Sequence, residues 1–249
     1  MTNIVKLLYR LALRFPQRVF FQNNDDMKLF IDYHLVQEPK AKRIPGSGVN
    51  TVLFAPEGCE DKSGDFVFLL VARMLWDKGV GDFVEAAHLV KAEYPKVRFQ
   101  LLGFLDVDNP EAISRTQMQQ WVDEGSIEYL GASDDVKVQM KSADCVVLPS
   151  YYREGVPRTL LEAASLAKPI VTTDAIGCRD VVEDEKTGYL CEVKNPDDLA
   201  GKMKLLLMLT DVQRSNMGRY GREKMIREFD ESIVIDAYLN AIHAIDVEE

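Results

Sequence analysis

From Asp65 onward, the chain alternates short apolar runs with longer stretches in which apolar residues recur at helical spacing. The short runs are typical of buried strands, and the longer stretches are typical of amphipathic helices. Residues 66–72 are almost continuously apolar, as expected of a strand buried on both faces of a parallel sheet. The alternation therefore predicts an α/β fold, a Rossmann-like parallel sheet flanked by helices.

The same pattern gives approximate bounds for each element. Strands are expected at residues 66–72, 97–102, 126–130, 144–148, 169–173 and 189–193. Helices are expected at 79–93, 110–124, 134–142, 157–167, 179–183, 196–209, 211–229 and 231–245. We assign residues 51–230 to one Rossmann-like domain and 231–249 to a C-terminal helix.

Residues 1–50 do not continue this series. They predict a helix that ends before Pro16, one strand at 18–22, a second helix at 25–35 and a Gly/Pro-rich crossing segment at 43–50. One strand cannot bury both faces of a parallel sheet, so we expect an incomplete domain that leans on the main one. Apolar surface exposed in such a domain would favour a homodimer.

The first helix mixes apolar residues with Lys6, Arg10 and Arg14. These charges interrupt the apolar run and no small-residue cleavage site follows, which argues against a signal peptide. A basic amphipathic helix can bind a membrane surface, although packing against a sheet is the favoured interpretation. No run of about 18 apolar residues occurs, so no transmembrane segment is predicted.

Charge and cysteine content narrow the class of protein. Forty acidic and thirty basic residues give a net charge of -10, which disfavours non-specific nucleic-acid binding. The three histidines show no short ligand spacing, so no metal site is predicted. Four widely spaced cysteines favour reduced thiols and a cytoplasmic location, with contact at the inner face of the membrane left open: Cys59, Cys145, Cys178 and Cys191.

Ligands of open parallel sheets bind beyond the carboxyl ends of the strands, so the residues that follow those ends are candidates for a site. Arg73 and Lys78 follow the first main strand, on a loop that leads into a helix. An arginine fork, a mobile lysine charge and the amides of a helix start can together bind a diphosphate. Solvated surface charge is the competing interpretation, because this spacing also arises by chance.

The segment from Glu154 to Glu162 holds two glutamates on either side of a helix start. Pro157 suits the first helical turn, which places Glu154 in the preceding loop and Glu162 about 7.5 Å further along the axis. One carboxylate could accept hydrogen bonds from a sugar and the other from a ribose diol. One alternative is that both glutamates are solvated surface acids, but the apolar neighbours of Glu162 argue against it. Another is the acid/base pair of a glycoside hydrolase, and the position of the two residues around a helix start argues against that.

Four motifs follow one another along the chain: Val71–Arg73 with Lys78–Gly79, then Leu148–Ser150, Glu154–Glu162 and Thr173–Asp180. Together they resemble the nucleotide-sugar-binding domain of family 4 retaining glycosyltransferases, which have the GT-B fold and are also called glycosyl transferases group 1. Residues 46–50 resemble the interdomain crossing segment of that family. The last helices resemble those that return toward its N-terminal domain, and the resemblance covers roughly residues 18–245.

The resemblance implies a role for each candidate residue. Arg73 and Lys78 would hold the donor diphosphate and stabilise the charge that develops on it, and Glu154 would orient the sugar, which makes these three the candidate catalytic residues. The substrate-binding candidates are Glu162 at the ribose, Asp134 near the base, and Gly155, Val156, Thr159 and Leu160 at the sugar and phosphates. The donor would be a UDP- or GDP-sugar, with no metal or other cofactor.

The implied reaction is transfer of a sugar, with retention, to a sugar or lipid-linked acceptor in polysaccharide or lipopolysaccharide biosynthesis. Residues 1–50 would be the remnant of an acceptor domain, so turnover is expected to need a missing N-terminal partner domain. A non-catalytic sugar-nucleotide-binding module and a GT-B sugar-nucleotide epimerase remain alternatives. A dehydrogenase is disfavoured, because no G-x-G-x-x-G follows the first main strand.

Overall fold

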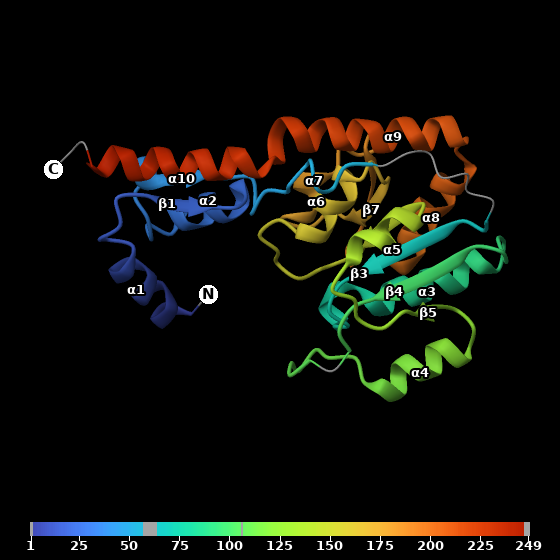
Figure 1. Cartoon of the computed structure of the whole chain (residues 1–249). Coiled ribbons are helices and arrows are strands. Elements are labelled where there is room, and N and C mark those ends of the chain that lie inside the picture. The colour runs from blue at the N-terminus through green and yellow to red at the C-terminus, as the bar shows by residue number, and fades with distance from the viewer. Residues whose placement is uncertain (1, 57–63, 106, 247–249) are drawn as a thin grey trace.

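The computed structural model describes residues 2–56, 64–105 and 107–246 (Figure 1). Within these ranges the main domain holds a six-stranded sheet in the order β5-β4-β3-β6-β7-β8, and every neighbouring pair is parallel. This confirms the predicted Rossmann-like sheet. The strands are β3 (Val67–Val71), β4 (Arg98–Leu102), β5 (Glu128–Tyr129), β6 (Cys145–Leu148), β7 (Ile170–Thr173) and β8 (Gly188–Cys191).

Helices cover both faces of this sheet. One core cluster joins it to α3 (Val80–Lys91), α4 (Arg115–Asp123) and α8 (Pro196–Met208). The opposite cluster joins it to α5 (Val136–Ser142), α6 (Arg158–Ser165), α7 (Cys178–Val181) and the π-helix η3 (Met225–Phe229). In β3, Phe68 and Leu70 belong to the first cluster and Leu69 to the second, so the strand is buried on both faces as its sequence predicted.

The strand order runs outward from the two central strands, first toward one edge of the sheet and then toward the other. The chain passes from β3 to β4 and β5 on one side, and from β6 to β7 and β8 on the other. The neighbours β3 and β6 therefore form the topological switch point, where the loops that follow their carboxyl ends diverge and leave room for a ligand. We call these the β3 loop (residues 72–79) and the β6 loop (residues 149–157).

The N-terminal unit (residues 2–43) is a smaller assembly. It contains α1 (Asn3–Ala12), β1 (Val19–Phe21), α2 (Asn24–Asp32), the short helix η1 (Glu38–Lys40) and β2 (Ala41–Arg43). Among the described residues, β1 and β2 form a two-stranded parallel sheet, one strand more than predicted. Lys42 and Arg43 are exposed in β2, so this three-residue strand lacks the apolar pattern that would reveal it.

The first helix does not pack against a sheet, contrary to the favoured prediction. Instead, α1 contacts α2: the Tyr9 and Phe30 rings meet edge to face with centroids 5.0 Å apart. Phe21 of β1 also packs on α2, and the neighbouring Phe20 packs on Tyr238, so both faces of the small sheet are occupied. The apolar stripe of α1 stays exposed, and it comprises Ile4, Leu7, Leu8, Leu11 and, just beyond the helix, Phe15.

The C-terminal segment returns to this unit. After α9 (Asp211–Lys224) and η3, α10 (Glu231–Asp246) runs along the N-terminal unit, as the red and blue ribbons of Figure 1 show. Two helices differ from their predicted bounds. Residues 211–229 are not one continuous α-helix, because the hydrogen-bond ladder changes register at Met225. Similarly, α4 begins at Arg115 rather than near 110, since the Ser114 hydroxyl accepts the Gln117 N–H and caps the helix there. No helix in the described part of the chain is long and apolar enough to cross a membrane.

Two chain segments connect the N-terminal unit with the main domain, and they run side by side. The Val49 N–H donates to the Phe229 carbonyl at 2.9 Å, and the Glu231 N–H donates to the Val49 carbonyl at 3.0 Å. The Asn50 side chain adds a hydrogen bond of 2.7 Å to the Glu231 carboxylate. These bonds join the two connections laterally.

Candidate functional site

Backbone contacts fasten the β3 and β6 loops to each other at the switch point. The carbonyl of Asp77 accepts hydrogen bonds from the Tyr151 and Tyr152 amides, each at 3.1 Å, and from the Ser150 hydroxyl at 3.2 Å. The short helix η2 (Trp76–Lys78) ends at Gly79, whose φ of 74° lets the chain turn directly into α3. Side chains on the two loops therefore have fixed relative positions.

Lys78 and Glu154 form a direct ion pair across these loops. Their side chains are only 14% and 13% exposed, so the pair is shielded from water on most sides. Glu154 also accepts a hydrogen bond of 3.1 Å from the Ser150 hydroxyl, and the Tyr152 ring centroid lies 5.1 Å from the Lys78 ammonium. The sequence assigned these two residues to different parts of one ligand, and the structure brings them into contact.

Arg73 lies just beyond the carboxyl end of β3 and is exposed. Within the described ranges its guanidinium has no hydrogen-bond or salt-bridge partner. Lys78, in contrast, already has Glu154 as its counter-ion. Arg73 is therefore the cation of the β3 loop whose donors remain available to an anionic ligand.

The start of α6 supplies backbone donors. Pro157 is the N-cap residue, one position before the first turn in which the sequence placed it, and the helix begins at Arg158. The amides of Arg158 and Thr159 find no acceptor among the described residues, as is usual at a helix start. Val156 and Leu160 have buried side chains, so they could meet a ligand only through their backbone. The free amides at the start of α6, together with the helix dipole, favour binding of an anion there.

Glu162 lies one turn further along α6 and is 7% exposed. Its carboxylate accepts a hydrogen bond of 2.7 Å from Nε of Arg158, a residue on the preceding turn. Burial raises the pKa of Glu162, and the Arg158 guanidinium opposes that shift. A carboxylate held inside an apolar helix face at this cost in desolvation is typical of a binding site.

Asp134 is not part of this group. It is exposed in the turn before α5, beyond the carboxyl end of β5, and β4 separates β5 from β3 in the sheet. The described hydrogen bonds and ion pairs include no contact between Asp134 and the other candidates. The structure brings Lys78 into contact with Glu154 and places Arg73 and the α6 start on the same two neighbouring loops, whereas Asp134 follows β5, two strands from β3 along the same edge.

Two further residues hold the β6 loop: Asn23, which the sequence did not single out, and Gly177, which lies within the Thr173–Asp180 motif but was given no role there. The Asn23 carboxamide donates to the Gly155 carbonyl at 3.0 Å. Gly177, with φ of 83°, packs so closely that a Cβ there would lie 2.4 Å from the same carbonyl oxygen. The local signals were a capping pattern after a strand for Asn23 and, for Gly177, its place in that motif before a short helix.

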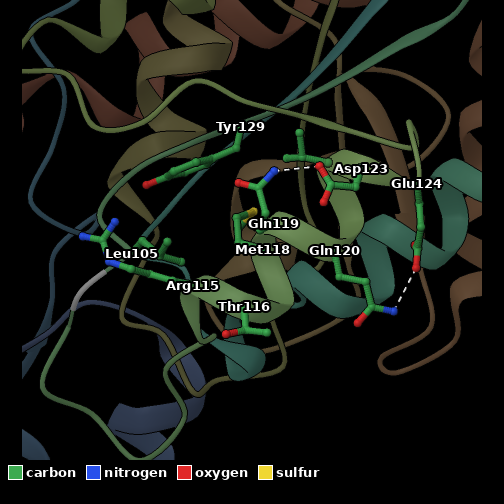
Figure 2. A pocket seen from close by; sticks show the side chains of 10 residues that line it. Leu105, Arg115, Thr116, Met118, Gln119, Gln120, Asp123, Glu124 and Tyr129 are labelled. Carbon is green, nitrogen blue, oxygen red and sulfur yellow. Dashed lines mark hydrogen bonds between the residues drawn. The ribbon is translucent and has the colours of Figure 1, made fainter.

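A depression of about 900 Å³ lies elsewhere, on the outer side of α4 (Figure 2). Its walls include Leu105 and Tyr129, and Figure 2 shows the Gln119–Asp123 and Gln120–Glu124 hydrogen bonds along the helix. These bonds join residues four apart on one helix face, as is common on exposed helices. The depression contains none of the candidate residues, so its size does not make it the functional site.

The three cysteines that the structure describes lie in the core. Cys145, Cys178 and Cys191 are free and buried, and burial raises the pKa of Cys178 to about 11 and that of Cys191 to about 12. Such thiols are poor nucleophiles at neutral pH. Cys59 lies outside the described residues. Within those residues, no cluster of three or more His, Cys, Asp or Glu side chains could hold a metal ion.

The strand order and the two joined loops at its switch point define a Rossmann-like domain of the GT-B class. The family model described as Glycosyl transferases group 1 matches residues 57–224. The chain belongs to this family.

Named relatives support the same grouping. The chain is 30% identical over 247 residues to the N,N'-diacetylbacillosaminyl-diphospho-undecaprenol alpha-1,3-N-acetylgalactosaminyltransferase of Campylobacter jejuni, a match that covers 95% of this chain and 62% of that protein. It is 28% identical over 243 residues to the UDP-Gal:alpha-D-GlcNAc-diphosphoundecaprenol alpha-1,3-galactosyltransferase of Escherichia coli, covering 91% and 61%. The chain thus spans less than two thirds of the length of these relatives.

Solved structures show the fold. Anabaena Alr3699/HepE, crystallised with UDP, superposes with a TM-score of 0.85 at 20% identity, covering 97% of this chain and 69% of that one. A glycosyltransferase from Rickettsia africae gives a TM-score of 0.83 at 20% identity, covering 96% and 66%. The match extends over the N-terminal unit as well as the main domain.

Proposed function

We propose that this chain binds a nucleoside-diphosphate sugar at the switch point and serves as the donor half of a retaining glycosyltransferase. The observation that carries the proposal is the Lys78–Glu154 pair, which joins the β3 and β6 loops at the switch point, where Arg73 and the unpartnered amides of α6 lie on the same two loops. A diphosphate needs several donors and positive charge in one place, and this edge supplies both.

The electrostatics support a division of roles. Arg73 and the α6 amides would hold the diphosphate, and Lys78 would offset the charge of Glu154, which would otherwise repel it. Glu162 would accept hydrogen bonds from the ribose diol, and Glu154 would accept them from the sugar hydroxyls. Because HepE has been crystallised with UDP and with UDP-glucose, a UDP-sugar is the donor that we test first.

In the proposed reaction, the bond between sugar C1 and the diphosphate oxygen breaks while the acceptor oxygen bonds to C1 on the same face. The acceptor proton ends on the departing diphosphate, so no protein group must form a covalent intermediate. Arg73 and Lys78 would stabilise the charge that grows on the leaving group, which is the interaction that accelerates the step. No metal or other cofactor enters this scheme.

We further propose that the acceptor is a sugar carried on a lipid diphosphate, in assembly of a cell-surface polysaccharide at the inner face of the membrane. The names of the Campylobacter and Escherichia coli relatives support this acceptor class. The opposite wall of the cleft would come from a polypeptide that completes the N-terminal unit and covers the exposed stripe of α1. A second copy of the chain is the alternative occupant of that stripe.

Calorimetric titration with UDP, GDP and their glucose and N-acetylgalactosamine conjugates tests the donor site. We expect binding by the wild-type chain and affinities about tenfold or more lower for Arg73→Ala and Glu162→Ala. Lys204→Ala serves as the control, because Lys204 pairs with Glu93 away from the switch point. Absence of binding, or equal affinity in all variants, would overturn the assignment.

Turnover needs a separate measurement. Release of UDP with transfer to a lipid-linked acceptor, in the presence of the N-terminal region of a relative, would support a transferase. Tight donor binding with no transfer under any condition would favour a non-catalytic module. Release of an inverted sugar without transfer would favour an epimerase.

A further inference from the structure

Asn23 has two separate sets of hydrogen bonds, one on each end of its carboxamide. The residue follows β1 and is fully buried. Its Oδ1 accepts the Asp26 N–H at 2.7 Å, which caps α2. This half of the carboxamide acts within the N-terminal unit and is an ordinary helix cap.

The other half of the carboxamide reaches the β6 loop of the main domain. Nδ2 donates to the Gly155 carbonyl at 3.0 Å, and the Glu154 carbonyl lies 3.3 Å away, so the bond joins segments more than 130 residues apart. Nδ2 is also 2.9 Å from the Asp26 carboxylate. In the described part of the chain, no other donor reaches either loop carbonyl. Without Nδ2, these two carbonyls would lose the one donor that the described residues supply to them.

The loop is also confined from a second side. Gly177 packs against it so tightly that a Cβ would lie 2.4 Å from the Gly155 oxygen and 2.9 Å from the Glu154 oxygen. Beside it, the Arg153 guanidinium pairs with the Asp26 carboxylate at 2.6 Å, a second tie to α2. The backbone that carries Glu154 is therefore clamped between the N-terminal unit and the start of α7.

We propose that Asn23 is a positioning residue for the donor site: its Nδ2 fixes the Glu154–Gly155 backbone and so places the Glu154 carboxylate beside Lys78. This inference rests on the proposed function, because it assumes that Glu154 contacts the donor sugar. It assigns to the N-terminal unit a direct part in shaping the donor pocket of the main domain. The contact lies next to a cavity of about 540 Å³ whose walls include Gln22, Asp26 and Gly155.

Asn23→Asp separates the two functions of the side chain. Aspartate keeps an acceptor for the Asp26 N–H and remains a good N-cap, but its ionised carboxylate has no donor for the loop carbonyls and repels the Asp26 carboxylate. The titration is therefore done at neutral pH or above, and Asn23→Ser, which adds no charge, is measured beside it. We expect the affinity for a UDP-sugar to fall about tenfold while the affinity for UDP, which lacks the sugar, changes by less than about threefold. The measurement is calorimetric titration of the full chain with UDP, UDP-glucose and UDP-N-acetylgalactosamine, together with the melting temperature.

Asn195 provides a matched control. It caps α8 in the same manner, with Oδ1 accepting the Asp198 N–H at 3.0 Å and Nδ2 bonded to the Glu192 carboxylate at 2.9 Å. Asn195→Asp should leave the ratio of UDP-sugar to UDP affinity unchanged. If Asn23→Asp does not fold, Asn23→Ser keeps a capping hydroxyl while shortening the side chain, and the same ratio is measured.

The outcomes separate this inference from the proposed function. An unchanged ratio in the Asn23 variants, or a loss for both ligands in step with a lower melting temperature, would overturn the positioning role. Failure of the wild-type chain to bind any of the three ligands would instead overturn the donor site itself. In a Glu154→Gln background, the change in ratio caused by Asn23→Asp should largely disappear, because the side chain that it positions has been altered.

Discussion

A side chain on Gly79 would place its Cβ 2.1 Å from the carbonyl oxygen of Pro149. The two residues end the β3 loop and begin the β6 loop, so their backbones are in contact where the candidate site lies. No rearrangement of a flexible side chain could relieve such a clash, because both partners are main chain. The close approach of the two loops therefore requires glycine at position 79.

Gly79→Ala is expected to lower the free energy of unfolding by about 3 kcal/mol or more, because it adds this clash to the cost of a left-handed backbone. Gly125 has the same φ of 74°, and a Cβ there would meet nothing within 4 Å, so Gly125→Ala isolates the backbone term. We expect about 1–2 kcal/mol for that control. Urea denaturation of both variants measures the difference, and equal losses would contradict the crowding argument.

Lys78→Met should cost both stability and ligand affinity. The substitution leaves the Glu154 carboxylate, 13% exposed, without its counter-ion, and we expect a loss of about 1–3 kcal/mol in the free energy of unfolding. Lys204→Met, which breaks a more exposed pair with Glu93, should cost less than about 1 kcal/mol. Chemical denaturation reports both values.

The double variant Lys78→Met with Glu154→Gln separates these effects. Removing both charges should recover part of the lost stability, because no buried carboxylate remains unpaired. Affinity for UDP should stay low, since the positive charge is still absent. Recovery of affinity together with stability would show that Lys78 acts only as a structural partner of Glu154.

Glu162→Gln should gain stability relative to the wild type as the pH rises. Burial raises the pKa of Glu162 in the folded chain above its ordinary value of 4.5, so ionisation favours the unfolded state. The stability that this group contributes is present at low pH and is lost as the pH rises through the raised pKa. Denaturation between about pH 4 and pH 7 should show the stability of the variant rising relative to that of the wild type.

The same substitution should weaken UDP binding by about tenfold, because an amide offers a ribose diol one acceptor oxygen in place of a carboxylate. A residue that lowers stability while it raises affinity is typical of a functional site. Calorimetric titration of the variant at neutral pH measures the loss. Unchanged affinity for UDP would show that Glu162 acts only as a buried partner of Arg158.

Leu8→Ser tests the exposed stripe of α1. Leu8 is 60% exposed, so the free energy of unfolding should change by less than about 0.5 kcal/mol. If a second copy of the chain covers the stripe, self-association measured by sedimentation over a range of concentrations should weaken, because the stripe loses apolar area; unchanged self-association would count against that occupant. Phe21→Ala, at a buried position, should instead cost about 3 kcal/mol or more and leave the stripe intact.

The sequence was sufficient for the main sheet because its strands are apolar and its helices amphipathic over many residues. The continuous run around β3 and the glutamate pair around Pro157 are local patterns, and the structure retains both. In contrast, β2 is three residues long with two exposed cations, which leaves no periodicity to detect. The π-helix after Lys224 is likewise invisible, because its residues follow the same apolar stripe as a continuous helix.

The contacts that shape the candidate site could not be predicted from local sequence patterns, because they join residues far apart in the chain. Lys78 and Glu154 are 76 residues apart, and Asn23 and Gly155 are 132 apart. Composition and spacing place such residues at strand ends, but only the packed chain decides which ends touch. Asn23 looked like a helix cap, and it is one, yet half of its carboxamide faces another part of the molecule.

The lateral bonds between Val49 and the residues around Asp230 have a mechanical consequence. The segment that leaves the N-terminal unit and the segment that leads into α10 pass side by side at this one place, tied to each other by main-chain hydrogen bonds. If the N-terminal unit rotated relative to the main domain, the two bonded segments would have to bend together at this place. Such a rotation would also move Asn23 relative to the Glu154 and Gly155 carbonyls that its Nδ2 reaches, so bending at this place and the Asn23 contact are coupled.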